Sequence, residues 1–570
     1  MAYTDKDKEL AIIADMKATR VPYENLWREV DQHVAPGMLR LQLADANRGT
    51  REDSLIINSA ADKAFETFQN GMISNVTNPS QPWIEIATDD QDLSDYGPVA
   101  VFCEDVAREM LTITEDAGVY EDLKSVYAYG GKFANGLMWM EENYKRVIHT
   151  QPMAVGQWWI GKDEFGDPNC LYREIRMSVR QVVMMFLDKR KPDWNKVSRK
   201  VKEAWDKGRY GEPCDVGHLV LPNDDSDEKY VEASGKPFRS CYFEIGGERD
   251  RADQEKYLRE SGYDEFPGLF FPWDVFGDDV YGMNSPGITT LPDNKELQHW
   301  ALKCAVGLDN MVDPAMMGPP GFKKKGGFFP GSFHAMQDSD LQRGGVRPVR
   351  ETPPQILDAK QHELAIEKRL QDGWYMGVFR YLDPTNASAR TATEIAARQQ
   401  QNMLELVGTM NRLNRGILNP YTERLFNYMV RQGRIGPNGI KIPPELAGQQ
   451  LKIRYISQMA QAMRSINVTS IDRLLETAIR IANEGKNPQV WNKLNVYECI
   501  DASARSLGTP ARVIRSDEEV AVMEAEQKQA AAAEQKMMQL QTMTKGVKDL
   551  ASAPTDGKNA LTDVAQALGG

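Results

Sequence analysis

The sequence predicts a helix-rich α+β fold. Long stretches carry apolar residues at helical spacing, and the longest of them lie in the second half of the chain. A block of short alternating segments between residues 136 and 177 is typical of β-strands. The 570 residues are enough for a large core and for several domains.

The first hundred residues predict two helices and a strand. A helix is expected over Asp5–Val34, with a break near Pro22 because proline removes a backbone donor. An amphipathic helix follows, in which the apolar side chains recur at helical spacing. These side chains are Ala61, Ala64, Phe65, Phe68, Met72 and Ile73. Residues 82–86 then alternate like a strand.

Residues 99–285 predict a mixture of helices and strands. Helices are expected over Val99–Ala117 and Val119–Tyr129, and Gly130–Gly131 is expected to end the second one. Short helices are expected over Val179–Phe186, capped by Ser178, and over Trp194–Asp206. Strands are expected over Gly136–Glu142, Ile148–Pro152, Gln157–Lys162, Cys170–Met177, Asp215–Leu221, Pro237–Ile245 and Gly268–Trp273. Residues 1–285 thus form one mixed α/β region.

The stretch from Asp293 to Gln400 predicts helix, compact lobe, helix, polar loop and helix. The first helix has an apolar stripe of Leu297, Trp300, Ala301, Cys304 and Leu308. Residues 311–354 are rich in proline and glycine, which predicts a lobe of turns. The second helix carries Ile366, Leu370 and Trp374, and Gly373 and Gly377 suit its end. A third helix opens at Thr391–Glu394.

The last third of the chain is mostly helical. Ala392–Arg431 predicts a long helix that bends near Gly408, Gly416 and Pro420. Strand and turn are expected over residues 433–456, and helices over Ser465–Glu484, Trp491–Ser506 and Ser516–Leu550. The last helix has few large apolar residues, so it needs neighbours from other subunits or stays mobile. Residues 551–570 are expected to be disordered.

Charge and cysteine content exclude some classes of protein. The chain has 69 Lys and Arg against 82 Asp and Glu, a net charge of −13, which disfavours a tight duplex-DNA binder. The six cysteines form no C-x-x-C pair, which argues against structural zinc and a disulfide framework. No apolar run is long enough to span a membrane, and the N-terminus does not resemble a signal peptide.

Enzyme motifs are missing. The sequence has no phosphate loop of the G-x-x-x-x-G-K-[ST] type and no G-x-S-x-G elbow. His362–Glu363 begins a pattern like H-E-x-x-H, but Ile366 replaces the second zinc ligand. Acidic pairs such as Asp278–Asp279 are expected by chance among 82 carboxylates. We therefore expect no catalytic residues, no metal and no cofactor.

Two polar segments remain as candidate sites. Lys323, Lys324 and Lys325, with Arg343, Arg347 and Arg350, give the lobe a positive bias, which fits either a solvated loop tip or contacts to phosphate or an acidic partner. The loop Phe379–Arg390 has a polar tip and is bracketed by arginines. Its candidate residues are Arg380, Asp383, Asn386 and Arg390.

The order of several short motifs resembles the portal, or head-to-tail connector, proteins of short-tailed bacteriophages. The motifs are Pro82–Trp83, Tyr281–Gly287, Leu291–Asp293, Asp313–Pro314, Phe329–Gly331, Arg347–Pro348, Thr391–Glu394, Trp491–Leu494, Gly508–Pro510 and Arg515–Glu519. The specificity lies in this order, which spans about the last 300 residues with weaker matches in the first 90.

The resemblance implies a portal fold with wing, stem, clip and crown, assembled as a ring of usually twelve subunits. On this sequence the implied parts are wing 1–285, first stem helix 286–310, clip 311–354, second stem helix 355–376, tunnel loop 377–391, wing helix and strands 392–460, crown 461–550 and a tail at 551–570. It also implies that the tunnel loop faces the narrowest part of the channel.

The resemblance implies a function as the channel through which double-stranded DNA enters and leaves the capsid. The implied partners are the terminase, tail adaptor or nozzle proteins, and capsid and scaffolding proteins. The protein would be assembled in the host bacterial cytoplasm and reside in the virion, at one capsid vertex. Two alternatives stay open: an ATPase or nuclease of the packaging machinery, and a minor head protein that forms no ring.

Overall fold

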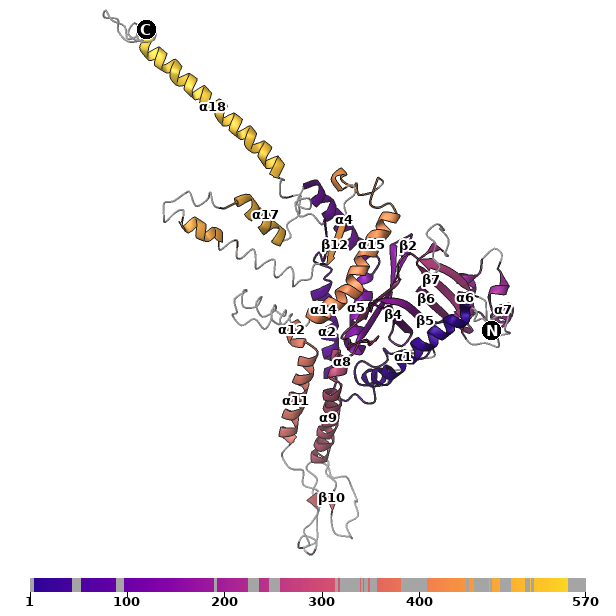
Figure 1. Cartoon of the computed structure of the whole chain (residues 1–570). Helices are drawn as coiled ribbons and strands as arrows, with labels where there is room; N and C mark the ends of the chain where they lie inside the picture. The colour runs from indigo at the N-terminus through magenta and orange to yellow at the C-terminus, as the bar shows by residue number, and fades with distance from the viewer. Residues whose placement is uncertain are drawn as a thin grey trace, which may run out of the picture. The chain divides into compact units, whose positions relative to one another are not determined.

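A computed structural model gives the arrangement of most of the chain (Figure 1). The structure describes residues 5–43, 53–88, 97–188, 192–223, 235–245, 257–312, 316–317, 339, 342, 347–348, 356–380, 407–437, 439–446, 451–455, 471, 474–481, 494–507, 513 and 517–551. The chain divides into two compact units. The larger unit comprises Met1–Ile86, Asp105–Ile442 and Lys452–Ile466, and the smaller comprises Ala87–Glu104, Pro443–Leu451 and Asn467–Gly570.

The larger unit contains a five-stranded and a three-stranded antiparallel sheet among its described residues. Their strand orders are β4-β5-β6-β7-β8 and β3-β2-β9. The strands are β2 (Asn135–Asn143), β3 (Val147–Pro152), β4 (Trp158–Lys162), β5 (Pro168–Ser178), β6 (Pro213–Pro222), β7 (Phe238–Glu244), β8 (Arg259–Tyr263) and β9 (Gly268–Pro272). The predicted strands are confirmed. The sequence Arg-Glu-Ser-Gly-Tyr of β8 lacks apolar alternation, so that strand was not predicted.

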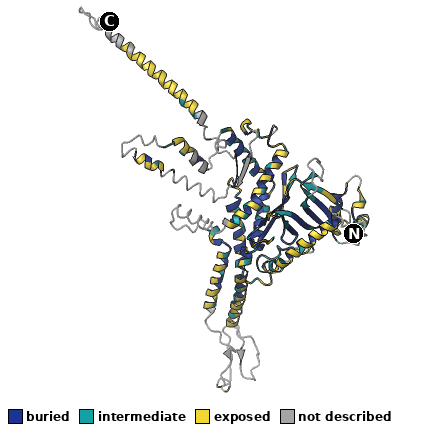
Figure 2. Cartoon of the chain, in the orientation of Figure 1, coloured by how far each residue is buried: buried dark blue, intermediate teal, exposed yellow. Residues whose placement is uncertain are grey.

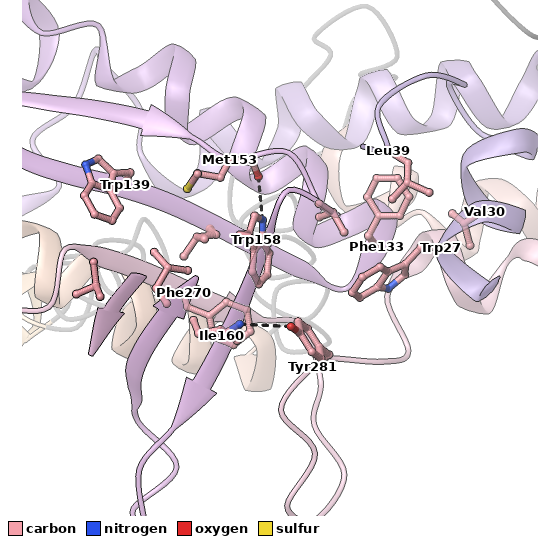
Figure 3. Close-up of a cluster of buried hydrophobic side chains, with 14 of the residues drawn as sticks. Trp27, Val30, Leu39, Phe133, Trp139, Met153, Trp158, Ile160, Phe270 and Tyr281 are labelled. Atoms are coloured by element: carbon pink, nitrogen blue, oxygen red, sulfur yellow. Dashed lines mark hydrogen bonds between the residues drawn. The ribbon is translucent and has the colours of Figure 1, made fainter. Parts of the chain in front are cut away.

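One aromatic core joins the two sheets to the first helix (Figure 3). Trp139 from the three-stranded sheet, Trp158 from the five-stranded sheet and Trp27 from α1 (Asp5–His33) all belong to it. The Trp158 indole donates a 3.4 Å hydrogen bond to the carbonyl of Met153. The Tyr281 hydroxyl accepts one of 3.4 Å from the backbone of Ile160. These two polar groups thus keep partners inside the apolar cluster, whereas the buried Trp27 indole nitrogen has no hydrogen-bond partner among the described residues.

The helices confirm the helix-rich α+β prediction. In the larger unit they are α1, α2 (Ala60–Val76), α5 (Val119–Phe133), α6 (Val179–Phe186), α7 (Arg199–Asp206), α8 (Pro286–Thr289), α9 (Leu291–Val312), α11 (Ile356–Gly373), α12 (Met376–Arg380), α14 (Val407–Leu413) and α15 (Asn419–Arg431). The smaller unit holds α17 (Val496–Leu507) and α18 (Asp517–Ala551), and α4 (Gly97–Asp116) spans the boundary.

The predicted break at Pro22 is wrong, because α1 continues through it to His33. Proline cannot donate to the carbonyl four residues earlier, which here belongs to Ala18. Both Pro22 and Ala18 are exposed, so solvent can hydrogen-bond to the freed carbonyl. Pro22 therefore lies on the solvent-exposed face of α1, where the helix continues through it.

The predicted end of α5 at Gly130–Gly131 is also wrong, because the helix runs on to Phe133. A β-carbon on Gly131 would lie 2.3 Å from the Phe68 ring, and one on Gly130 would lie 2.8 Å from Phe271. The two glycines thus permit close packing of α5 rather than ending it.

Two further helices differ from the sequence expectation. The predicted helix Trp194–Asp206 is divided into a 3₁₀ turn, Trp194–Lys196, and α7, because Ser198 is extended and caps α7 through Val201 N. The predicted bend after residue 407 is present as a π-helix, Asn414–Leu418, between α14 and α15. Gly416 lies in this π-helix, where a β-carbon would meet the carbonyl of Phe270 at 2.2 Å.

In the smaller unit, the Tyr497 hydroxyl of α17 donates a 2.5 Å hydrogen bond to Glu524 of α18. The described part of α18 is largely exposed (Figure 2). Its exposed apolar side chains include Val522, Met538 and Leu540. A helix that buries so little needs partners for stability.

We expect Gly131→Ala and Gly408→Ala to change stability in opposite directions. Both glycines lie in helices, but an added β-carbon would come within 3 Å of a side chain only at Gly131; at Gly408 it would meet nothing within 4 Å. Overpacking predicts a loss of about 1–3 kcal/mol for Gly131→Ala, and helix propensity predicts a gain of roughly 0.5–1 kcal/mol for Gly408→Ala. Denaturant unfolding followed by tryptophan fluorescence measures both, and equal effects would contradict this packing.

Candidate functional site

The helices α9 and α11 form an antiparallel pair that leaves the body of the larger unit (Figure 1). Leu297, Ala301 and Cys304 of α9 are buried, as are Ile366 and Leu370 of α11. At the far end of this helix pair, β10 (Met316–Met317) pairs with β11 (Arg347–Pro348). The predicted helix–lobe–helix order therefore corresponds to two packed helices, and the short strand after the first helix pairs with the short strand before the second.

The boundaries of the helix pair differ slightly from the prediction. The expected first helix, 286–310, is divided at Thr290 into α8 and α9, and α9 continues to Val312. The expected loop 377–391 starts with helical residues, since α12 ends at Arg380. Tyr375 turns the chain between α11 and α12 with a φ of 56°. Gly373, expected at the end of the second helix, is the last residue of α11, and it also allows close approach, because a β-carbon there would lie 2.4 Å from Thr290.

A polar clamp ties the helix pair to the segment before α2. Gln298 of α9 accepts hydrogen bonds from the backbone of Ile57 (2.7 Å) and Asn58 (2.8 Å). Its amide nitrogen donates to the Asn58 carbonyl (2.9 Å) and to Asn294 Oδ1 (2.8 Å). Asn294 in turn donates to the carbonyl of His33 at the end of α1 (2.7 Å). Buried amides with complete sets of partners fix α9 against two other segments.

The clamp extends to α11 through Asn58. The Asn58 amide nitrogen donates to Glu363 (3.0 Å) and Glu367 (2.7 Å). Glu363 is 3% exposed and also accepts from Lys360 (2.7 Å), so its charge is compensated. His362 lies 3.1 Å from Glu296 of α9. The sequence pattern His362–Glu363 therefore serves the contact between the helices, and we name Asn58, Asn294, Gln298, Glu363 and Glu367 the clamp.

An aromatic cluster holds the body end of α11. The buried Trp374 ring lies 5.4 Å from Phe65 and 5.6 Å from Phe68, both in edge contacts with α2. Phe379 of α12 packs on Phe68 at 5.9 Å. A β-carbon on Gly71 would lie 2.2 Å from the Phe379 ring, so α2 approaches this cluster as closely as glycine allows. The pair is thus fixed by apolar packing as well as by the clamp.

A buried ion pair supports the start of α8 and α9. Lys132 of α5 is fully buried and donates to Asp31 (2.5 Å) and to the Ala35 carbonyl (3.0 Å). Burial outweighs the attraction of Asp31 and lowers the pKa of Lys132 to about 8. The backbone carbonyl of Lys132 accepts a hydrogen bond from the Ser285 hydroxyl (3.3 Å), and a β-carbon on Gly287 would lie 2.4 Å from that oxygen. The motif Tyr281–Gly287 is therefore a tight packing motif.

Most of the predicted site residues lie outside the described part of the chain. These are Lys323, Lys324, Lys325, Arg343, Arg350, Asp383, Asn386 and Arg390. Arg347 is placed in β11 opposite Met317, and Arg380 ends α12, but neither side chain is described. Their proposed contacts stay predictions.

The described residues offer neither a metal site nor a membrane span. Among them, no group of three or more His, Cys, Asp or Glu side chains is arranged to hold a metal ion. Within the same ranges, no helix has the length and apolar character needed to cross a membrane. Asp278 and Asp279, interpreted above as a chance acidic pair, are both exposed.

Comparison with known proteins decides the family. Residues 7–514 match the family described as bacteriophage head to tail connecting protein. The chain is 32% identical to the portal protein of Salmonella phage epsilon15, over all of this chain and 99% of that protein. It is 28% identical to the probable portal protein of Bordetella phage BPP-1 with the same coverage. The chain belongs to the bacteriophage portal, or head-to-tail connector, family.

Membership confirms the resemblance drawn from the motif order and the expectation of a non-enzymatic structural component of the phage particle. The clamp was not predicted from the sequence. Its contacts join residues about 240 to 309 positions apart, such as Asn58 with Gln298 and Glu367, and no local pattern identifies such partners.

We expect Gln298→Ala to destabilise the junction between the helix pair and the body. It removes the acceptor for the backbone N–H groups of Ile57 and Asn58, and each of these part-buried hydrogen bonds contributes about 0.5–1.5 kcal/mol. Urea unfolding measures the loss, and protease cleavage between residues 53 and 59 should become faster. Gln361→Ala is the matched control, because Gln361 is exposed on α11. If both variants behave alike, the clamp does not anchor the helices.

Proposed function

We propose that this protein forms a homo-oligomeric ring, with twelve copies as the expected number, at one vertex of the capsid. The ring encloses the channel for packaging and ejecting double-stranded DNA. The full-length similarity to the epsilon15 portal protein carries this proposal. In this assignment α9 and α11 are the stem, residues 311–354 the clip, 377–391 the tunnel loop, 461–550 the crown, and most of residues 1–285 with 392–460 the wing.

Apolar side chains on the helix pair support the ring. Leu302 and Val306 of α9 are each 47% exposed, and they lie one turn apart. Leu364 of α11 is also exposed. A ring has heterologous interfaces, in which one face of a subunit meets a different face of the next. Neighbouring stems would cover these side chains, which a single chain leaves in water. The exposed α18 would likewise gain partners from adjacent copies.

The charge of the chain supports a conduit. A net charge of −13 disfavours tight binding of DNA along a channel and keeps friction low. A few Lys and Arg side chains would make weak, exchangeable contacts with DNA phosphates. These contacts do not depend on the DNA sequence, because every sequence has the same phosphate backbone. We assign such contacts to Lys323, Lys324, Lys325, Arg343, Arg347 and Arg350 at the clip. We assign Arg380, Asp383, Asn386 and Arg390 to the tunnel loop at the narrowest point.

The family name implies a junction between head and tail, and the partners follow from that position. We propose that the clip binds the terminase during filling and tail adaptor or nozzle proteins afterwards. Capsid and scaffolding proteins would contact the outer parts of the ring. Assembly would take place in the host bacterial cytoplasm, before incorporation into the virion.

Electron microscopy combined with native mass spectrometry tests the ring. We expect annular particles with a central hole and a mass near twelve times 64.3 kDa. The charge-inserting variant Leu302→Glu/Val306→Glu should weaken assembly, because it places carboxylates in the proposed contact. Tyr144→Glu/Phe165→Glu inserts two carboxylates at exposed side chains in turns of the sheets and serves as the matched control.

Particles that stay near 64.3 kDa at every concentration, also with scaffolding protein present, would contradict the ring. Turnover of ATP or cleavage of DNA by the purified chain would contradict a purely structural role and favour the packaging-enzyme alternative.

A further inference from the structure

The described residues around α7 carry an excess of positive charge that the conduit does not use. Residues 192–209 hold six basic against three acidic side chains, a net charge of +3 in a chain of −13. The basic ones are Lys196, Arg199, Lys200, Lys202, Lys207 and Arg209. Figure 1 places α6 and α7 beside the five-stranded sheet, away from the helix pair α9 and α11. We name Arg180, Lys196, Lys200 and Lys202 the basic surface.

The basic surface is defined by cations that folding leaves without ion-pair partners in the described residues. Within the described part of the chain, none of its four side chains makes an ion pair. Of the three acidic side chains in residues 192–209, Glu203 binds Arg199 (2.8 Å) and Lys207 (3.4 Å), Asp193 caps the backbone of Asn195, and Asp206 is exposed one turn beyond Lys202. Glu212, just after them, binds Arg209 (3.2 Å). All four side chains of the basic surface are exposed. The unpaired cations are therefore available to an anion from outside.

The position of these cations does not help the protein to fold. Lys200 and Lys202 lie in the first turn of α7, where the helix dipole disfavours positive charge. Like charges this close also repel one another. A bound polyanion would relieve both penalties, so the placement of these lysines favours ligand binding over a role in stability.

The platform under the basic surface is well defined. Val201 and Ala204 of α7 pack with Val182 of α6 in a buried cluster on the sheet. Ser198 Oγ accepts from Val201 N, and Ser198 N donates to Glu244 of β7 (2.7 Å). Beside it the Trp205 and Tyr210 rings meet edge to face at 4.8 Å. The lysines thus extend from a backbone that folding has already fixed.

We propose that the basic surface binds the phosphate backbone of duplex DNA on the outside of the protein. Duplex DNA presents about one negative charge per 1.7 Å of its axis, so several lysines can each meet a phosphate. Exposed ammonium groups without base-reading partners give contacts that do not depend on sequence. This DNA-binding role is separate from the proposed conduit. The basic surface lies apart from the helix pair α9 and α11, and a single subunit could bind DNA there without forming a ring.

Binding of relaxed, covalently closed circular DNA tests this proposal. A closed circle offers no end to thread through a channel, so its retention reports an outer surface. We compare the full chain with Lys196→Glu/Lys200→Glu/Lys202→Glu in gel-shift titrations at several salt concentrations. The wild type should bind the circle at low salt. The variant should bind at least about tenfold more weakly, with a slope of log affinity against log salt smaller by roughly three, about one for each lost phosphate contact.

Two further variants make the test decisive. Lys63→Glu/Lys145→Glu/Lys441→Glu changes the net charge equally at exposed lysines on other elements, and it should bind as the wild type does. Lys196→Gln/Lys200→Gln/Lys202→Gln removes the charges without inserting carboxylates. It should also bind DNA more weakly, and its urea unfolding curve should match that of the wild type.

Three outcomes would overturn the proposal. The wild type would fail to bind the circular DNA at low salt, the two glutamate variants would lose the same amount of DNA affinity, or the protein would prefer particular DNA sequences. The first would favour an acidic protein segment as the occupant. Ring formation is scored separately by mass, so failure of this site is distinguishable from failure of the conduit.

Discussion

The structure depends on the attachment of two long helices to a body made largely of antiparallel sheets. Gln298 is the centre of that attachment, because its side-chain amide binds the backbone of residues 57 and 58 and the side chain of Asn294. Asn58 then carries the connection to Glu363 on α11. Gln298, Asn294 and Glu363 are buried and Asn58 is half-buried, so loss of one side chain leaves polar partners of the others unsatisfied. Such a network specifies one arrangement of the helix pair rather than merely stabilising it.

Apolar packing and close backbone approaches surround this network. Trp374 is wedged against Phe65 and Phe68, and Gly71 admits Phe379 where any other residue would clash. Next to α8, Lys132 and Asp31 form an ion pair that ties α5 to the end of α1. These contacts together connect the helix pair to the sheets through α1, α2 and α5. In the ring that we propose, this connection would transmit force between the helix pair and the sheets, which fits the family's description as head to tail connecting protein.

The sequence predicted the elements better than their contacts. Apolar spacing identified α2, α9 and α11, and alternation identified the strands of both sheets except β8, whose sequence is polar. The errors at Pro22 and Gly130–Gly131 have one cause: local rules treat these residues as breakers, whereas tertiary context decides. Pro22 lies on the solvent-exposed face of α1, and at Gly131 the Phe68 ring leaves no room for a β-carbon. The clamp and the unpaired lysines around α7 were not predicted, since both depend on which residues folding brings together or leaves without partners.

The helix pair and the body should unfold as one unit, which native-state hydrogen exchange in increasing urea tests most directly. We predict that the amides of Leu297–Cys304 in α9 and Ile366–Leu370 in α11 exchange through the same opening, with the same free energy and urea dependence, as those of α2 and β2. Exchange of the helix pair through a separate opening of much lower free energy, with the α2 and β2 amides still protected, would contradict this coupling.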